Sequence, residues 1–145
     1  MKQIIIETTV RVRYAETDAS GVVYHANYLI WFELGRGEWF WQQQRDYHRD
    51  VEMRGLAWPV TELSARYVAP ARYGERVTIR TWLAEIQSRA FKIAYEVVNA
   101  ENRQLLCTGW TKHYNVDSQT NRAVPMPAEL RKFLEGEEYK IHKRT

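Results

Sequence analysis

A short stretch of the chain, residues 14–28, concentrates side chains that could take part in chemistry. It contains Asp18, Gly21 and His25, and it directly precedes a segment whose apolar residues recur near helical spacing. The N-terminus of a helix presents unpaired backbone N–H groups and the positive end of a dipole, so it can hold a developing oxyanion. A carboxylate there, such as Asp18, could attack a polarised carbonyl carbon or activate a water molecule. Gly21 would allow a tight turn or a close backbone approach.

Each of these residues also has an ordinary structural role. Asp18 could accept hydrogen bonds from its own loop, as Asp often does in turns. His25 could be a structural hydrogen-bonding residue, although the usual histidine pKa of about 6.5 suits proton transfer. Asn27 could cap the helix. Ser20 has neither a G-x-S-x-G setting nor an obvious base beside it, which argues against a serine hydrolase.

The elements that must position this loop follow from the spacing of apolar residues. Residues 4–14 alternate, which predicts a half-buried strand with Ile4, Ile6, Thr8, Val10, Val12 and Tyr14 on one face. Residues 27–44 predict a long helix. Trp31, Leu34 and Trp41 widen its apolar surface, so we expect it to be covered on most sides. Gly35 and Gly37 each cost that helix about 1 kcal/mol relative to alanine, so we expect another backbone to approach both closely.

In the rest of the chain, apolar residues recur at every second position. This predicts four strands, at residues 58–68, 76–87, 90–99 and 104–116. A short segment at residues 122–124 could return beside them, and Pro127 begins a predicted terminal helix through Leu134. The order of one strand, one long helix and then several strands indicates the α+β class. It has the outline of a hotdog fold, an antiparallel sheet wrapped around one long central helix.

Composition excludes several classes of protein. The chain has 145 residues, of which 45% are hydrophobic and 27% charged, so we expect a single domain at 1–145. The net charge is +3, and its visible excess lies in a basic C-terminal tail around Lys140. No basic face is evident, so we expect no nucleic-acid partner. With no signal-peptide core and no window long enough to span a bilayer, we expect a cytoplasmic protein without an integral membrane segment.

Neither a disulfide nor a metal site is expected. The single cysteine, Cys107, excludes an intramolecular disulfide and a multi-cysteine zinc site, and it is best interpreted as a small buried hydrophobe. The histidines lie far apart and show no ligand spacing: His25, His48, His113 and His142. We therefore predict no metal and no cofactor.

Residues 13–28, followed by Phe32, Glu33 and Arg36, closely resemble a known family. They are similar to the 4-hydroxybenzoyl-CoA thioesterase-like branch of the hotdog superfamily, which includes bacterial acyl-CoA thioesterases associated with the Tol-Pal cluster. Residues 67–75 also resemble that family's link between sheet strands, so the resemblance covers residues 5–135.

The resemblance implies hydrolysis of acyl-CoA thioesters to free acid and coenzyme A. It gives the chemistry to Asp18, either as a nucleophile or as a general base, and implies that a backbone N–H near Tyr24 and His25 polarises the carbonyl. Asn27 matches a position that flanks this site. The resemblance also implies a homo-oligomer, in which dimers join their sheets, share active sites across the interface and assemble into tetramers.

The contacts to coenzyme A and to the acyl group are also expected from the resemblance and from residue type. Phosphates need positive groups. Ser88 and Arg89, at a strand turn, lie where the resemblance implies nucleotide contacts, and Lys92 and Arg72 are weaker candidates. All four could equally be solvated surface residues. The acyl pocket could draw on large aromatic residues, which could equally be core: Trp31, Trp39, Phe40 and Trp58.

Several alternatives stay open at this point. The acyl carrier could be acyl carrier protein in place of coenzyme A, and the acyl group could be aromatic. A hotdog dehydratase is disfavoured, since Glu33 and Glu38 inside the helix have no neighbouring histidine. A non-catalytic hotdog module would bind acyl-CoA or a protein partner, and Asp18 would then be dispensable.

Overall fold

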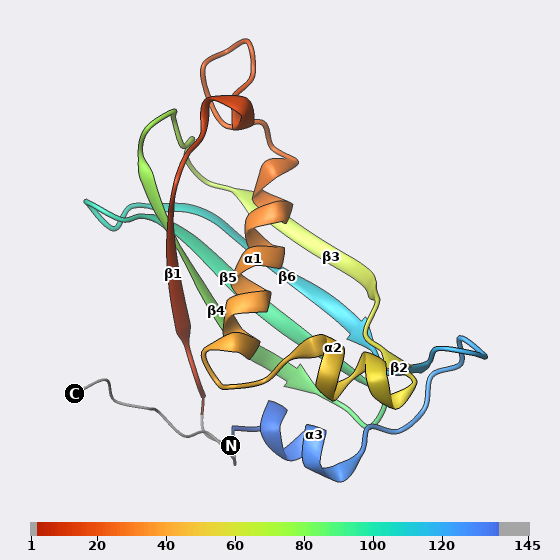
Figure 1. The fold of residues 1–145 in the computed structure, drawn as a ribbon. Helices are drawn as coiled ribbons and strands as arrows, with labels where there is room; N and C mark the ends of the chain where they lie inside the picture. Colours follow the sequence, from red (N-terminus) through yellow and green to blue (C-terminus); the bar gives the residue numbers. More distant parts are fainter. Residues whose placement is uncertain (1–2, 137–145) are drawn as a thin grey trace.

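A five-stranded antiparallel sheet with one long helix across its face forms the body of the protein (Figure 1). The structure is a computed structural model that describes residues 3–136. The strand order is β1-β4-β5-β6-β3, with bounds β1 Ile6–Arg11, β3 Val60–Tyr67, β4 Arg76–Ile86, β5 Ala90–Asn99 and β6 Leu105–Tyr114. A separate two-stranded ladder pairs β2 Leu56–Ala57 with β7 Val116–Asp117. The helices are α1 Asn27–Trp41, α2 Tyr47–Asp50 and α3 Ala128–Leu134, with 3-10 turns η1 Tyr14–Glu16 and η2 Glu52–Arg54.

The α+β class and the antiparallel sheet are confirmed. The period-two segments became β3 to β6, and β5 has the bounds predicted for it. The first strand is shorter than predicted, because the chain leaves the sheet after Arg11 and turns into η1. Tyr14, predicted on the buried face, is therefore exposed. Residues 122–124 contribute one isolated bridge, from Ala123 to Val116, and the tail around Lys140 lies outside the described residues.

The core lies between α1 and the inner face of the sheet. Alternate residues of β4 and β5 point toward the helix, and among them Ile79, Ile93 and Val97 are fully buried. Gly35 lies at the closest approach, because a Cβ built there would be 2.5 Å from the Thr81 hydroxyl oxygen. Side chains of the sheet, not a second backbone, therefore impose glycine at this position.

One expectation about α1, a close backbone at both glycines, was wrong. Nothing lies within 4 Å of a Cβ built on Gly37, so no backbone approaches it. One side of the helix is also uncovered within this chain, with Ile30, Leu34 and Trp41 exposed at 56%, 38% and 60%.

Among the described residues, no helix has both the length and the apolar character that crossing a membrane requires.

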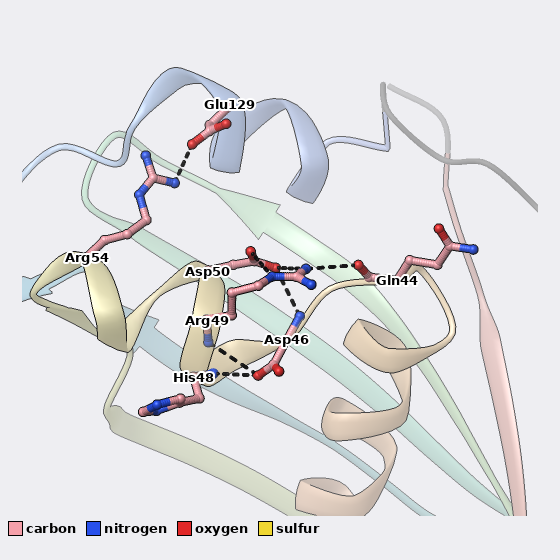
Figure 2. Close-up of polar contacts among 7 residues, drawn as sticks. All are labelled: Gln44, Asp46, His48, Arg49, Asp50, Arg54 and Glu129. Atoms are coloured by element: carbon pink, nitrogen blue, oxygen red, sulfur yellow. Dashed lines mark hydrogen bonds and ion pairs between the residues drawn. The ribbon is translucent and has the colours of Figure 1, made fainter.

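A polar cluster holds the short helices at the C-terminal end of α1 (Figure 2). Asp46 caps α2, since its Oδ1 accepts the backbone N–H groups of His48 and Arg49 at 2.9 and 3.3 Å. An ion pair between Arg54 and Glu129 joins η2 to α3. These contacts fix the segment that carries Tyr47, the first residue of α2.

Candidate active site

The loop that carries Asp18 is anchored by a neighbouring buried carboxylate, that of Glu16. Its Oε1 accepts the backbone N–H of Arg13 at 2.7 Å, and its Oε2 accepts the indole N–H of Trp31 at 3.1 Å. Because Trp31 belongs to α1, this carboxylate ties η1 to the helix. Sequence reasoning missed Glu16. The available signal was its spacing from Arg13, which matches the spacing of a capping box.

The backbone carbonyl of Glu16 holds the other end of the loop. It accepts the backbone N–H of Tyr24 at 2.9 Å and the side-chain amide of Asn27 at 2.8 Å. The cap position of α1 is Ala26, which makes no side-chain cap, so Asn27 does not cap the helix as one interpretation held. Its amide instead fixes the path of the loop relative to α1.

Asp18 is exposed and accepts one hydrogen bond. Its Oδ1 accepts the backbone N–H of Ser20 at 2.8 Å, so the local-turn role considered for this residue is real. Within residues 3–136 no other group contacts the carboxylate, and Oδ2 is left for a ligand. Gly21 donates its N–H to the Asp18 carbonyl at 3.0 Å and has a φ of 80°, which favours glycine.

A pocket of about 340 Å³ opens beside this carboxylate, and we call it the Asp18 pocket. His25, Tyr28 and Tyr67 line it with Asp18. The Tyr67 hydroxyl donates to the His25 carbonyl at 2.8 Å, while the Tyr28 hydroxyl accepts the Ala71 N–H at 3.2 Å. Burial raises the pKa of both tyrosines, so their hydroxyls stay protonated near neutral pH.

The N-terminus of α1 faces the same pocket. The N–H of Tyr24 is occupied by Glu16, whereas no acceptor within residues 3–136 contacts the N–H of His25 or of Ala26. The His25 ring packs against Tyr24, with ring centroids 4.4 Å apart. The arrangement thus offers a free carboxylate and free N–H donors at a helix end, which suits attack on a carbonyl that gains negative charge.

The residues predicted to contact coenzyme A fall into two groups. Arg72 pairs with Val22 in an isolated bridge, so it lies beside the Asp18 loop. Ser88 and Arg89 lie in the turn before β5, whose other end is near the Asp18 pocket. A strand rises about 3.3 Å per residue, so the eight steps from Ala90 to Val98 separate them by about 26 Å. Within one chain, Arg72 therefore lies far from Ser88 and Arg89.

Lys92 has partners of its own on the outer face of the sheet. Its Nζ lies 3.7 Å from a Glu85 carboxylate oxygen and 4.3 Å from the centroid of the Trp110 ring. A cation engaged in this way is less available to a phosphate group than the sequence suggested.

A second cavity, of about 390 Å³, lies at the other half of α1, and we call it the aromatic cavity. Phe40, Tyr47, Trp58 and Phe91 form its walls, and Gly37 lines it from the helix. Of the aromatic residues considered for an acyl pocket, Phe40 and Trp58 thus line a cavity. Trp31 and Trp39 belong to the buried core and line neither the Asp18 pocket nor the aromatic cavity.

A chain of hydrogen bonds runs from Arg36, at the cavity, through the buried inner face. Arg36 Nη1 donates to the Tyr95 hydroxyl at 3.1 Å, that hydroxyl contacts Thr111 Oγ1 at 2.7 Å, and Thr111 contacts His113 Nε2 at 2.7 Å. His113 Nδ1 lies 3.0 Å from the Trp58 carbonyl, so Nδ1 must carry the proton and donate. Burial lowers the pKa of His113 to about 4, so the ring is neutral near pH 7.

Comparison with known proteins identifies relatives over most of the chain. A model of the thioesterase-like superfamily matches residues 12–134. A putative acyl-CoA thioesterase of Bacillus subtilis, YneP, is 32% identical over 115 residues, which cover 79% of this chain and 82% of that protein. The acyl-CoA thioester hydrolase YbgC of Escherichia coli O157:H7 is 32% identical over 108 residues, covering 72% and 78%.

Solved structures show the same architecture. A hypothetical protein of Thermus thermophilus, TT1821, has a TM-score of 0.81 at 40% identity and covers 90% of this chain and 97% of its own. A 1,4-dihydroxy-2-naphthoyl-CoA thioesterase of Synechocystis, Slr0204, has a TM-score of 0.85 at 22% identity, covering 94% and 99%. At that lower identity the likeness concerns the fold alone.

Proposed function

Because this chain belongs to the thioesterase-like superfamily, we propose that it hydrolyses acyl-CoA thioesters to a free acid and coenzyme A, with Asp18 as the catalytic carboxylate. Curated relatives that are 32% identical are named for this reaction. The observation that carries the residue assignment is that Asp18 and His25 line one pocket at the N-terminus of α1. We also propose that the chain belongs to the narrower, Tol-Pal-associated branch of the family, because residues 13–28 resemble that branch.

The reaction needs a nucleophile, a stabiliser for the oxyanion and a leaving thiolate. The thioester carbonyl oxygen would accept the free N–H of His25, where the helix dipole favours the negative charge that develops. Asp18, held by Ser20 through Oδ1, would use Oδ2 to take a proton from water, and that water would add to the carbonyl carbon. The C–S bond then breaks, the thiolate of coenzyme A leaves, and the proton on Asp18 neutralises it.

The alternative route uses the same atoms in a different order. Oδ2 of Asp18 would itself attack the carbonyl, expel the thiolate and form a mixed anhydride that water then hydrolyses. The two routes differ in one intermediate. Hydroxylamine added near neutral pH during turnover would attack an anhydride at Asp18 and leave part of it as a hydroxamate on Asp18, which mass spectrometry detects, whereas the general-base route gives no hydroxamate on Asp18.

We further propose that the chain, one hotdog domain with α1 as the central helix of its sheet, forms dimers through the exposed edge of β3. This strand pairs with β6 on one side and with no strand of residues 3–136 on the other. Its inward-facing residues Val60, Leu63 and Tyr67 are 42%, 48% and 46% exposed. Pairing β3 with the same strand of a second copy would satisfy its free backbone groups and cover these side chains. Assembly of such dimers into tetramers is also part of the proposal.

Release of free coenzyme A from a panel of short, medium, long and aromatic acyl-CoAs tests the function. Wild type should hydrolyse at least one class, and Asp18→Asn should lose at least a hundredfold in kcat while keeping affinity for the acyl-CoA. An unchanged rate in Asp18→Asn would overturn the assignment of the carboxylate. If the protein hydrolyses acyl groups only when they are carried by acyl carrier protein, that protein and not coenzyme A is the acyl carrier of the substrate. If it hydrolyses neither kind of thioester, the result would favour a non-catalytic binding module.

A further inference from the structure

The hydroxyl of Tyr67 makes a contact that the mechanism above does not use. Tyr67 is the last residue of β3, and its hydroxyl donates to the His25 carbonyl at 2.8 Å, a normal length for an O–H···O hydrogen bond. Its ring packs edge-on against the rings of Tyr28 and His25, with centroids 5.2 and 6.2 Å apart. Phenylalanine would keep both ring contacts, so packing does not account for the hydroxyl.

The His25 carbonyl depends on this hydroxyl, because α1 itself supplies a poorer donor. The backbone nitrogen of Tyr28 lies 3.3 Å from the carbonyl oxygen, beyond the usual N–H···O limit of about 3.2 Å. A regular α-helix would direct the N–H of Leu29 to His25, but that N–H donates to the Ala26 carbonyl at 3.1 Å. Within residues 3–136, Tyr67 therefore makes the shortest hydrogen bond to the His25 carbonyl.

The peptide unit of that carbonyl also carries the N–H of Ala26. The carbonyl and the N–H of a trans peptide point in opposite directions, so a donor on the oxygen leaves the N–H open. Hydrogen bonds that follow one another polarise each other, which strengthens each by about 10–30%. No acceptor within residues 3–136 contacts the Ala26 N–H, at the end of α1 that faces the Asp18 pocket. Tyr67 therefore acts on one of the two donors left free for an oxyanion.

We propose that Tyr67 is a positioning residue for the oxyanion. Its hydroxyl fixes the peptide between His25 and Ala26 and strengthens the Ala26 N–H, which joins the N–H of His25 in binding the thioester oxygen as that oxygen gains negative charge. Tyr67 itself neither touches the reacting atoms nor transfers a proton. This inference rests on the proposed function, because it adds a donor to the same site.

The first test removes only the hydroxyl, with Tyr67→Phe. The rate of thioester cleavage in a single turnover should fall about two- to tenfold, which is what one neutral hydrogen bond is worth. KM should change little, because the oxyanion forms only toward the transition state. The matched control is Tyr73→Phe, an exposed tyrosine outside the Asp18 pocket, which should cleave at the wild-type rate. A wild-type rate in Tyr67→Phe would overturn the proposal.

The second test grades the strength of the donor while keeping the size of the ring nearly constant. Position 67 receives 3-fluorotyrosine or 3,5-difluorotyrosine, whose hydroxyls are more acidic and donate more strongly, at a pH where each stays protonated. Burial raises the pKa of Tyr67, which widens that pH range. Cleavage should be slowest with phenylalanine and should quicken in the order tyrosine, fluorotyrosine, difluorotyrosine. Equal rates for the three hydroxyl-bearing side chains would show a merely structural role and overturn the proposal.

The polarisation of the bound thioester gives a third readout. In Asp18→Asn, which should bind acyl-CoA without cleaving it, isotope-edited infrared spectroscopy follows the stretch of a 13C-labelled thioester carbonyl. Hydrogen bonds to the oxygen should lower this frequency relative to free acyl-CoA, and adding Tyr67→Phe should reverse part of the shift. Adding Tyr73→Phe should not. The same frequency with and without the Tyr67 hydroxyl would contradict the proposed action on the substrate.

A measurement without substrate separates this inference from the proposed function. Nuclear magnetic resonance of the 15N-labelled protein reports the amide nitrogen of Ala26, which moves downfield when the preceding carbonyl accepts a hydrogen bond. Tyr67→Phe should move this resonance upfield, and Tyr73→Phe should leave it in place. Should wild type hydrolyse no acyl-CoA, the proposed function fails, and this shift still judges the action of Tyr67 on the peptide. An unmoved Ala26 resonance in Tyr67→Phe would overturn the inference even in an active enzyme.

Discussion

Replacing Glu16 with glutamine tests whether a buried carboxylate holds the Asp18 loop on α1. The carboxylate accepts N–H groups from Arg13 and Trp31, through one oxygen each. A glutamine side chain keeps one oxygen and replaces the other with an NH2 group, so one of these donors faces a donor and loses its partner. Leaving a buried donor unsatisfied costs about 1–3 kcal/mol, and the surviving bond loses about 1 kcal/mol when its acceptor becomes neutral. Glu16→Gln should therefore lower the free energy of unfolding by about 2–4 kcal/mol.

Urea denaturation followed by far-UV circular dichroism measures this loss, and Glu62→Gln, an exposed carboxylate on β3, is the matched control. The control should change stability by less than about 0.5 kcal/mol. A double-mutant cycle with Trp31→Phe isolates the indole contact and should give a coupling energy of about 1 kcal/mol or more. A Glu16→Gln variant as stable as the control would refute the role of this carboxylate. A variant that is destabilised as expected but keeps the wild-type hydrolysis rate would show that the loop position does not depend on it.

Three further predictions follow from the packing of the core. Gly35→Ala would place its Cβ 2.5 Å from the Thr81 hydroxyl oxygen and should lose about 1–3 kcal/mol of stability by overpacking. Gly37→Ala meets no such contact and should gain up to about 1 kcal/mol. Urea denaturation of both variants measures this contrast. His113 is neutral in the fold with a pKa of about 4 against 6.5 unfolded, so as pH falls from 6.5 to 4 the unfolded chain binds a proton that the folded chain does not, and about 3 kcal/mol of stability is lost. His113→Gln should flatten that stretch of the stability profile, and an equally steep loss in the variant would contradict the assignment. Burial raises the pKa of Cys107 to about 11, so iodoacetamide at pH 8 should label the thiol only after unfolding, and rapid labelling of the native protein would contradict its burial.

The sequence alone was sufficient for the features that depend on local pattern. A strand buried on one face must alternate, so period two located β5 with its bounds, and Pro127 marked the start of the terminal helix. The chemical candidates were also local, since Asp18, Gly21 and His25 lie within eight residues at the start of a helix. Their proximity in the fold needs little beyond the path of one loop.

Tertiary structure decided the features that depend on partners far apart in the chain. Gly35 and Gly37 look alike in the sequence, yet one is pressed against Thr81 of β4 and the other faces a cavity, because helix rotation turns neighbouring positions toward different surroundings. The link from Arg36 to Tyr95 joins residues of α1 and β5 that no local pattern associates. The same holds for the edge position of β3, which depends on the order in which all five strands pair. Local spacing therefore determined which residues could act, and long-range packing determined which of them face a common space.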